Sequence, residues 1–218
     1  MTEMSLPDKA YLLACDVENN RLRDRQRAGL LIRAAALTDL LLRGRIADEN
    51  GRVVATGGTT GDLVLDELLA EIAADRHRKW KALVRRDARS TLQSVEAQLE
   101  AARVIELDTS RILGLFPRRR PAVLDVGAAK RLHALVEASL DETRPVSEVD
   151  PVDASLTALV AAIELNGAIP RGERRRHKDR IKHLEERGGA AVPALRRVFK
   201  ELRGSRAAIA ATQSGGGG

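Results

Sequence analysis

The residues best suited to chemistry in this sequence are arginines. The chain holds 30 Arg and 7 Lys among its 218 residues and carries a formal net charge of +6. Arg85 and Arg89 are four positions apart, so on one helix they face the same way. Such a row suits a phosphate monoester, because each guanidinium matches two phosphate oxygens at once. The arginines therefore favour an anionic partner, such as a phosphate group or an acidic membrane.

Arg33 lies beside the apolar stripe of a helical pattern over residues 30–41. We expect its stem to lie on that surface and its guanidinium to point outward, converging with Arg89 on one open pocket. Arginines also stand at positions 21, 23, 25 and 27. Near an acidic membrane, each exposed basic residue contributes about 1 kcal/mol. The alternative is that all these arginines are solvated or form surface ion pairs.

Other chemistries lack the residues that they need. His177 and His183 are six apart, on opposite sides of a helix, and cannot act together as metal ligands. The sequence holds neither a nucleophile-elbow serine nor an HExxH motif. The glycine-rich loop at 57–62 lacks the Lys-Ser/Thr ending of a triphosphate-binding loop, and its Asp62 would repel phosphate. A single cysteine, Cys15, excludes an internal disulfide. We expect no enzymatic activity, no cofactor and no metal.

The composition is that of a soluble globular protein, with 44% hydrophobic and 31% charged residues. The longest apolar run, 158–163, is far shorter than the ~18 residues that span a bilayer. The N-terminus does not resemble a signal peptide. Aromatic residues make up only 2%, too few for the stacking platforms on which single-stranded nucleic acids bind. We therefore expect a cytoplasmic protein that does not bind nucleic acid.

The elements that must position these arginines are mostly helical. Apolar spacing predicts helices over about 7–17, 30–41, 65–72, 80–102, 126–140, 151–166, 171–187 and 192–203. The pair Asn50-Gly51 is preferred in a two-residue type I′ turn and predicts a β-hairpin over 45–56. The expected fold is an all-α single domain over residues 5–203 with two small β-hairpins, followed by a flexible tail over 204–218.

The second predicted hairpin covers 104–116 and turns near Asp108, with the triplet Arg118–Arg120 at its exit. Its apolar residues are almost continuous: Ile112, Leu113, Leu115 and Phe116. They form either a core strand or an exposed edge, which would favour self-association or membrane contact.

Several segments occur in an order that is characteristic of one family. They are Leu40–Ile46 (LLLRGRI), Thr60–Glu67 (TGDLVLDE), the helix over 84–102 and the hairpin end Leu113–Pro117 (LGLFP). This set, spanning about residues 5 to 203, resembles the Golgi phosphoprotein 3 family. The resemblance implies a mostly helical, peripheral membrane protein that binds phosphatidylinositol 4-phosphate head groups, and Golgi-resident members hold glycosyltransferase tails. It also implies that the hairpin over 104–116 takes part in oligomer contacts.

The head-group site of the family uses a tryptophan and an arginine near one early helix and two arginines on a later helix. Here Arg33 and Arg89 match two of these positions. Asp24 replaces the tryptophan and Leu92 replaces the second late arginine.

We thus predict head-group binding by a non-enzymatic peripheral protein on the cytoplasmic face of a membrane. The candidate ligands of the phosphate are Arg33, Arg89, Arg85, Arg25 and Arg23. The alternative, favoured by Asp24 and Leu92, is a soluble cytoplasmic protein-interaction scaffold that has lost lipid binding.

Overall fold

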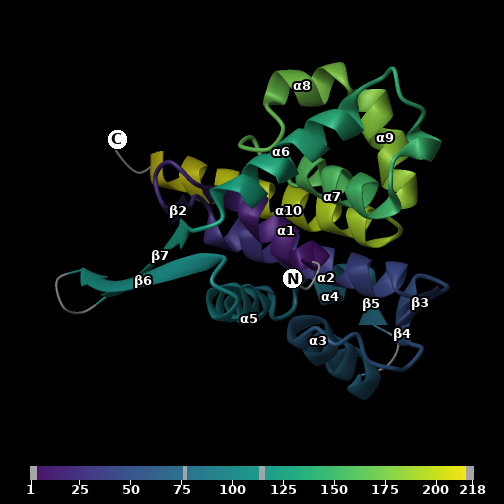
Figure 1. Cartoon of the computed structure of the whole chain (residues 1–218), viewed down its shortest axis with the longest axis horizontal. Helices are drawn as coiled ribbons and strands as arrows, with labels where there is room; N and C mark the ends of the chain where they lie inside the picture. The colour runs from purple at the N-terminus through teal and green to yellow at the C-terminus, as the bar shows by residue number, and fades with distance from the viewer. Residues whose placement is uncertain (1–3, 76–77, 113–115, 215–218) are drawn as a thin grey trace.

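The protein is mainly helical and carries a few short antiparallel strand pairs (Figure 1), which confirms the predicted fold class. In this computed structural model the backbone is described for residues 4–75, 78–112 and 116–214. Side chains are described for the same residues except 109–112, 116–119, 206 and 208–214.

The described helices follow the apolar periodicity of the sequence. They are α1 (Leu6–Ala14), α2 (Arg25–Leu42), α3 (Leu63–Ala74), α4 (Trp80–Arg85), α5 (Ala88–Ala101), α6 (Val126–Leu140), α7 (Pro151–Ala162), α8 (Arg171–Arg176), α9 (Lys178–Arg187) and α10 (Ala191–Ser214). A short 3-10 helix spans Val146–Glu148.

The described strands form three small antiparallel sheets. They are β1 (Cys15–Asp16) with β2 (Arg21–Leu22), β3 (Ile46–Glu49) with β4 (Arg52–Ala55) and β5 (Arg78–Lys79), and β6 (Ile105–Ile112) with β7 (Phe116–Val123). The predicted Asn50-Gly51 turn is confirmed, because both residues have positive φ, 55° and 80°. The pairs involving β1, β2 and β5 are too short to leave a signal in the sequence.

The centre of the molecule is α2. Every residue from Ala28 to Leu40 is buried, so this helix is covered on all sides. In Figure 1, α1 and α2 run through the middle of the molecule, with α6 to α9 on one side and α3 and α5 on the other. Any side chain on α2, including a charged one, must therefore find its partners inside the protein.

Aspartates begin four of the helices by accepting hydrogen bonds from backbone N–H groups of the first turn. These are Asp24 on α2, Asp62 on α3, Asp125 on α6 and Asp150 on α7. Asp24 Oδ1 accepts from Arg27 N at 3.0 Å. The residue in place of the expected tryptophan is thus a helix cap.

The helix predicted over 80–102 is broken in two. Arg86 and Asp87 leave the helical path between α4 and α5, and Asp87 takes a left-handed conformation with φ 49°. Arg85 and Arg89 therefore lie on different helices, and the prediction that they share one helical face is wrong.

The second hairpin is longer than predicted. β6 continues past Asp108, which pairs with Arg120 of β7, so the arginine triplet lies within a strand and not beyond it. Prolines are tolerated in β7 because a two-stranded ribbon has free edges. Leu113 and Leu115, and the side chains of Ile112 and Phe116, lie outside the described residues. Whether the apolar residues of this hairpin form a core strand or an exposed edge therefore stays a prediction.

Two predicted helices at the C-terminal end have different bounds. The helix expected over 171–187 is interrupted at His177, between α8 and α9. The last helix does not end near 203 but continues as α10 to Ser214, so residues 204–214 of the expected tail are helical.

Candidate anion-binding site

Arg33 is in the interior of the protein. Its side chain is 3% exposed, and its three nitrogens donate to Leu83 O (3.1 Å), Thr91 Oγ1 (3.0 Å) and Glu71 Oε2 (2.6 Å). The prediction that its guanidinium points outward is wrong, because the helix that carries it is buried on every side. Its charge is compensated by Glu71 of α3.

The hollow beside Arg33 is unsuited to an anion. It encloses about 150 Å³, and three carboxylates line it: Glu67, Glu71 and Asp87. These outnumber the one buried arginine, so phosphate would be repelled.

Arg89 and Leu92 do not complete a site with Arg33. Arg89 is exposed at the start of α5 and has no hydrogen bond or ion pair with any other described residue. It is two positions from Thr91, about 200° around the helix, so it lies away from the Arg33 contacts. Leu92 is 1% exposed and belongs to the core. The structure does not bring Arg33 and Arg89 together.

The other predicted arginines lie near carboxylates of the protein, which are buried for Arg23 and Arg25 and exposed for Arg85. Arg25 pairs with the fully buried Glu96 at 2.7 Å, and Arg23 pairs with Asp16 at 2.9 Å. Hydrogen bonds from Asn19 and Arg23 hold the pKa of Asp16 at about 2. Arg85 is exposed and lies 3.5 Å from Glu201 of α10.

A different basic surface lies between the end of α7 and helices α8, α9 and α10. Two adjoining hollows there enclose about 830 Å³ and about 540 Å³, and they share Glu164, Arg174, Lys178 and Arg203. We call them together the basic groove. The cations that line it are Arg171, Arg174, Arg175, Lys178, Lys182, Arg196, Lys200 and Arg203. Among the described residues, three carboxylates line it, Glu164, Asp179 and Glu185, so the described lining carries an excess of positive charge.

Four separate elements converge at Glu164, just after α7. Its carboxylate pairs with Arg203 of α10, and its backbone carbonyl accepts from Arg27 Nη1 of α2 at 3.3 Å. Arg174 of α8 donates to Asn166 Oδ1 at 2.8 Å in the same loop. We call Glu164 with Arg27, Arg174 and Arg203 the Glu164 cluster. It brings three guanidinium groups to one loop, and of the three only Arg203 pairs with the Glu164 carboxylate.

The close approach of several charged groups affects the pKa of Arg174. Burial lowers the pKa of Arg174. The charge of Glu164 opposes this shift, and the charges of Arg171 and Arg27 add to it. Arg27 also stacks on Phe199, with its guanidinium carbon 4.7 Å from the ring centroid. An added anion would relieve the repulsion among these arginines.

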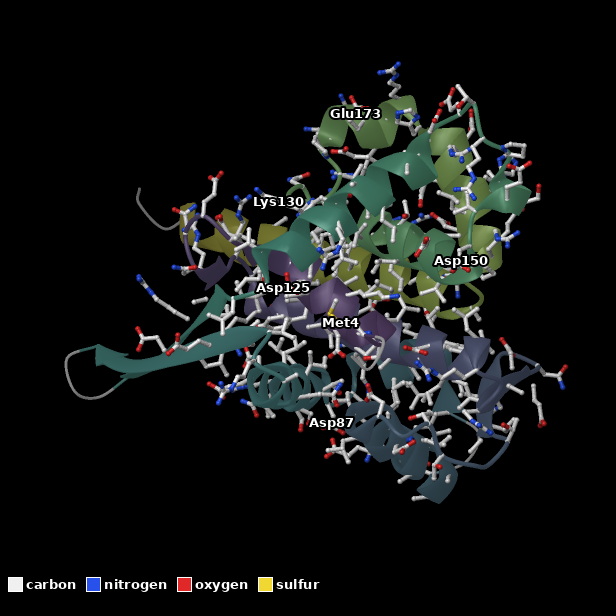
Figure 2. All side chains as sticks on the ribbon, viewed as in Figure 1. Met4, Asp87, Asp125, Lys130, Asp150 and Glu173 are labelled. Carbon is white, nitrogen blue, oxygen red and sulfur yellow. The ribbon has the colours of Figure 1, made fainter. Side chains whose placement is uncertain are left out.

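Local sequence patterns do not predict this cluster. Its members stand at positions 27, 164, 174 and 203. The packing of α2 on α10 and the contacts of α2, α8 and α10 with the loop after α7 bring them together. The one local signal was the run Arg174–Arg176 within a predicted helix. Figure 2 places the neighbouring Glu173 on α8 at the outer edge of the molecule.

Comparison with known protein families shows the family to which this chain belongs. A family model for Golgi phosphoprotein 3 (GPP34) matches residues 6–202. The chain belongs to the Golgi phosphoprotein 3 family. The match covers nearly the whole described fold, from α1 into α10, and confirms the resemblance inferred from the sequence. No curated protein matches the chain significantly.

This member of the Golgi phosphoprotein 3 family has a second surface of interest, a cleft of about 630 Å³ lined by Met4, Leu63, Arg43 and Asp125, among others. Met4 and Asp125 are labelled in Figure 2. The large apolar side chains exposed in the described part of the chain are Leu42, Leu63, Leu124 and Val126. Each lines this cleft or adjoins a residue that does. Of the helices described, none combines the length and apolar character needed to cross a bilayer.

Proposed function

We propose that this protein binds the head groups of anionic phospholipids, with a phosphoinositide of the phosphatidylinositol 4-phosphate type as its ligand. It acts as a non-enzymatic peripheral protein on the cytoplasmic face of a membrane. The observation that carries the proposal is the Glu164 cluster, in which Arg27, Arg174 and Arg203 meet at the loop after α7 and only Arg203 pairs with the Glu164 carboxylate. Membership of the Golgi phosphoprotein 3 family supports the same ligand class.

The chemistry of the cluster suits a phosphate monoester. Such a group carries a charge of about −1.5 to −2 at neutral pH and accepts paired hydrogen bonds from arginine. The exposed Arg171 and Arg175 stand one turn apart on α8 and line the same hollow. They contribute about 1 kcal/mol each near an acidic membrane. Neither the buried Arg33 nor Leu92 takes part in this binding.

Vesicle co-sedimentation tests the proposal. Phosphatidylcholine vesicles with and without phosphatidylinositol 4-phosphate are compared at low and physiological salt, together with phosphatidylserine vesicles of equal charge. We expect the wild type to pellet best with the phosphoinositide. The variant Arg171→Gln/Arg175→Gln should bind about 10- to 30-fold more weakly, because it loses two contacts of about 1 kcal/mol each.

The matched control is Arg85→Gln/Arg89→Gln, which removes the same charge from exposed positions outside the basic groove. It should pellet like the wild type. Equal losses in the two double variants would show binding by net charge alone and overturn the assignment to the groove. If the wild type pellets with no anionic vesicle, the function itself is wrong.

The alternative function is a soluble interaction scaffold. Its supporting observation is the cleft lined by the exposed Leu63, because an exposed apolar side chain in a hollow favours protein contacts. The exposed Leu42, Leu124 and Val126 are next in sequence to Arg43 and Asp125 of its lining. Cell fractionation separates the two. A protein found wholly in the cytosolic fraction, together with failure to pellet on vesicles, favours the scaffold.

A further inference from the structure

The larger hollow of the basic groove runs between two helices. The face of α10 that lines it is Arg196, Phe199, Lys200, Arg203, Gly204 and Ala207, which repeats at three and four residues. The opposing wall is α9, with Lys178, Ile181 and Lys182, and the last turn of α7 adds Ala161 and Ala162. These three helices lie together in Figure 1.

The groove is apolar along its floor, and cations outnumber carboxylates along its edges. On α9, Asp179 and Glu185 also line it, and Glu185 pairs with Arg196 of α10. The floor consists of Ile181 from α9, Phe199 from α10 and the alanines of α7, each 8% exposed or less, so the apolar strip that it presents is narrow. Lys182 stands on one edge and Lys200 on the other, and both are exposed. At one end the larger hollow adjoins the smaller one, and the two share Glu164, Arg174 and Arg203 of the cluster. A ligand that fits is apolar along its length and anionic at its head.

We infer that the groove binds a single-chain anionic amphiphile, with its phosphate at the Glu164 cluster and its alkyl chain along the floor between α9 and α10. The inference rests on the proposed function and extends it. The protein recognises one acyl chain of the lipid as well as the head group. A lysophospholipid bearing a terminal phosphate is the ligand class that satisfies both parts.

An alkyl chain suits this groove better than a peptide does. The groove is lined mainly by helices, whose backbone groups are already hydrogen-bonded within each helix. An extended peptide would bring its own backbone N–H and C=O groups to a floor of Ile181 and Phe199, which offers them no partner. An alkyl chain has no such groups and gains from contact with the same side chains.

Calorimetric titration with a series of alkyl phosphates tests the inference. The probes are inorganic phosphate, butyl phosphate and dodecyl phosphate, the last kept below its micelle concentration. For the wild type we expect affinity to rise by up to about fourfold for each methylene that the groove covers. An affinity that does not change with chain length would overturn the inference.

The variant Gly204→Trp blocks the groove. A Cβ built at Gly204 meets no atom within 4 Å, so a side chain can be added there without a clash at its base. Because Gly204 lines the groove beside Arg203, the comparison is made within each variant. Gly204→Trp should lose most of the gain in affinity between butyl phosphate and dodecyl phosphate. Gly204→Ala is the matched control and should retain that gain. If Gly204→Trp unfolds, Ala207→Trp on the same face replaces it.

The outcomes separate this inference from the proposed function. If Gly204→Trp still pellets on phosphoinositide vesicles but has lost the chain-length dependence, both stand. If the wild type pellets and shows no chain-length dependence, only the head group is recognised and the inference fails. Displacement of dodecyl phosphate by an acidic amphipathic peptide that binds more tightly would assign the groove to a protein partner and also overturn it.

Discussion

Arg33 and Glu71 form an ion pair that ties α2 to α3, with Arg33 Nη2 2.6 Å from Glu71 Oε2. The same guanidinium also donates to the carbonyl of Leu83 in α4 and the hydroxyl of Thr91 in α5. One side chain therefore contacts three helices besides its own. The arginine that matches the head-group position of the family holds the interior of this protein together.

Replacing Arg33 should destabilise the fold. Arg33→Ala removes three hydrogen bonds and leaves Glu71 partly uncompensated, which costs about 3 kcal/mol or more for a buried pair. The measurement is the free energy of unfolding in urea. Arg89→Ala, on an exposed side chain with no described partner, is the control and should change it by less than about 0.5 kcal/mol. Equal stabilities of the two variants would contradict this role.

Stability should also depend on the protonation of Asp8. Asp8 is 5% exposed and accepts hydrogen bonds from Ser5 and from Gln98, which also donates to Asp62. Burial, helped by the charge of Asp62, raises the pKa of Asp8 from 3.8 to about 6. The folded state therefore binds this proton more tightly than the unfolded state. The resulting stabilisation is complete below pH 3.8 and is lost as the pH rises through about 6.

The variant Asp8→Asn removes this titration. Relative to the wild type, its free energy of unfolding should rise by about 2–3 kcal/mol between about pH 3.5 and pH 7.5. Asp141→Asn is a control of opposite sign, because the backbone hydrogen bond from Thr143 lowers the pKa of Asp141. A difference between Asp8→Asn and the wild type that is constant with pH would show that Asp8 does not titrate in this range.

The single cysteine should be unreactive in the native protein. Burial raises the pKa of the Cys15 thiol from 9.0 to about 12, so almost no thiolate is present at pH 8. We expect iodoacetamide to modify Cys15 only as fast as the protein unfolds, as followed by mass spectrometry with and without urea. Labelling of the folded protein at the rate of a free thiol would contradict this.

The sequence predicted the fold better than the site. Helices with clear apolar spacing and the Asn50-Gly51 turn depend on local signals, and the structure contains them. The break at Asp87 carries no glycine or proline, so the pattern over 80–102 looked continuous. Local spacing placed Arg85 and Arg89 on one face, but the left-handed Asp87 separates them.

The candidate site could not be predicted from local sequence patterns, because it depends on how distant helices pack. The residues around Arg33 are apolar on all sides of the helix, and this was the available sign that Arg33 would be buried. The prediction that Arg33 is exposed used only its position beside the apolar stripe and did not take those neighbours into account. The Glu164 cluster joins residues up to 176 positions apart, from Arg27 to Arg203, through the packing of four elements. Its arginines could be counted in the sequence, but their convergence could not be predicted from it.

Gly29 permits the close approach of α2 to α5 on which the Arg33 contacts depend. A Cβ at Gly29 would lie 2.7 Å from the backbone oxygen of Ala88, the first residue of α5, and a backbone atom cannot move aside alone. Gly29→Ala gains about 1 kcal/mol of helix propensity, but overpacking of about 1–3 kcal/mol opposes it.

We therefore expect Gly29→Ala to lower the free energy of unfolding in urea. Gly204→Ala, in a helix where the new Cβ meets no atom within 4 Å, should raise it by up to about 1 kcal/mol. Because a shift of α5 also moves Thr91 away from Arg33, the double variant Gly29→Ala/Arg33→Ala should lose less than the two single losses combined. Strict additivity would show that the contact at Gly29 and the arginine network are independent. A gain in Gly29→Ala equal to that in Gly204→Ala would show that the helices are not in close contact there.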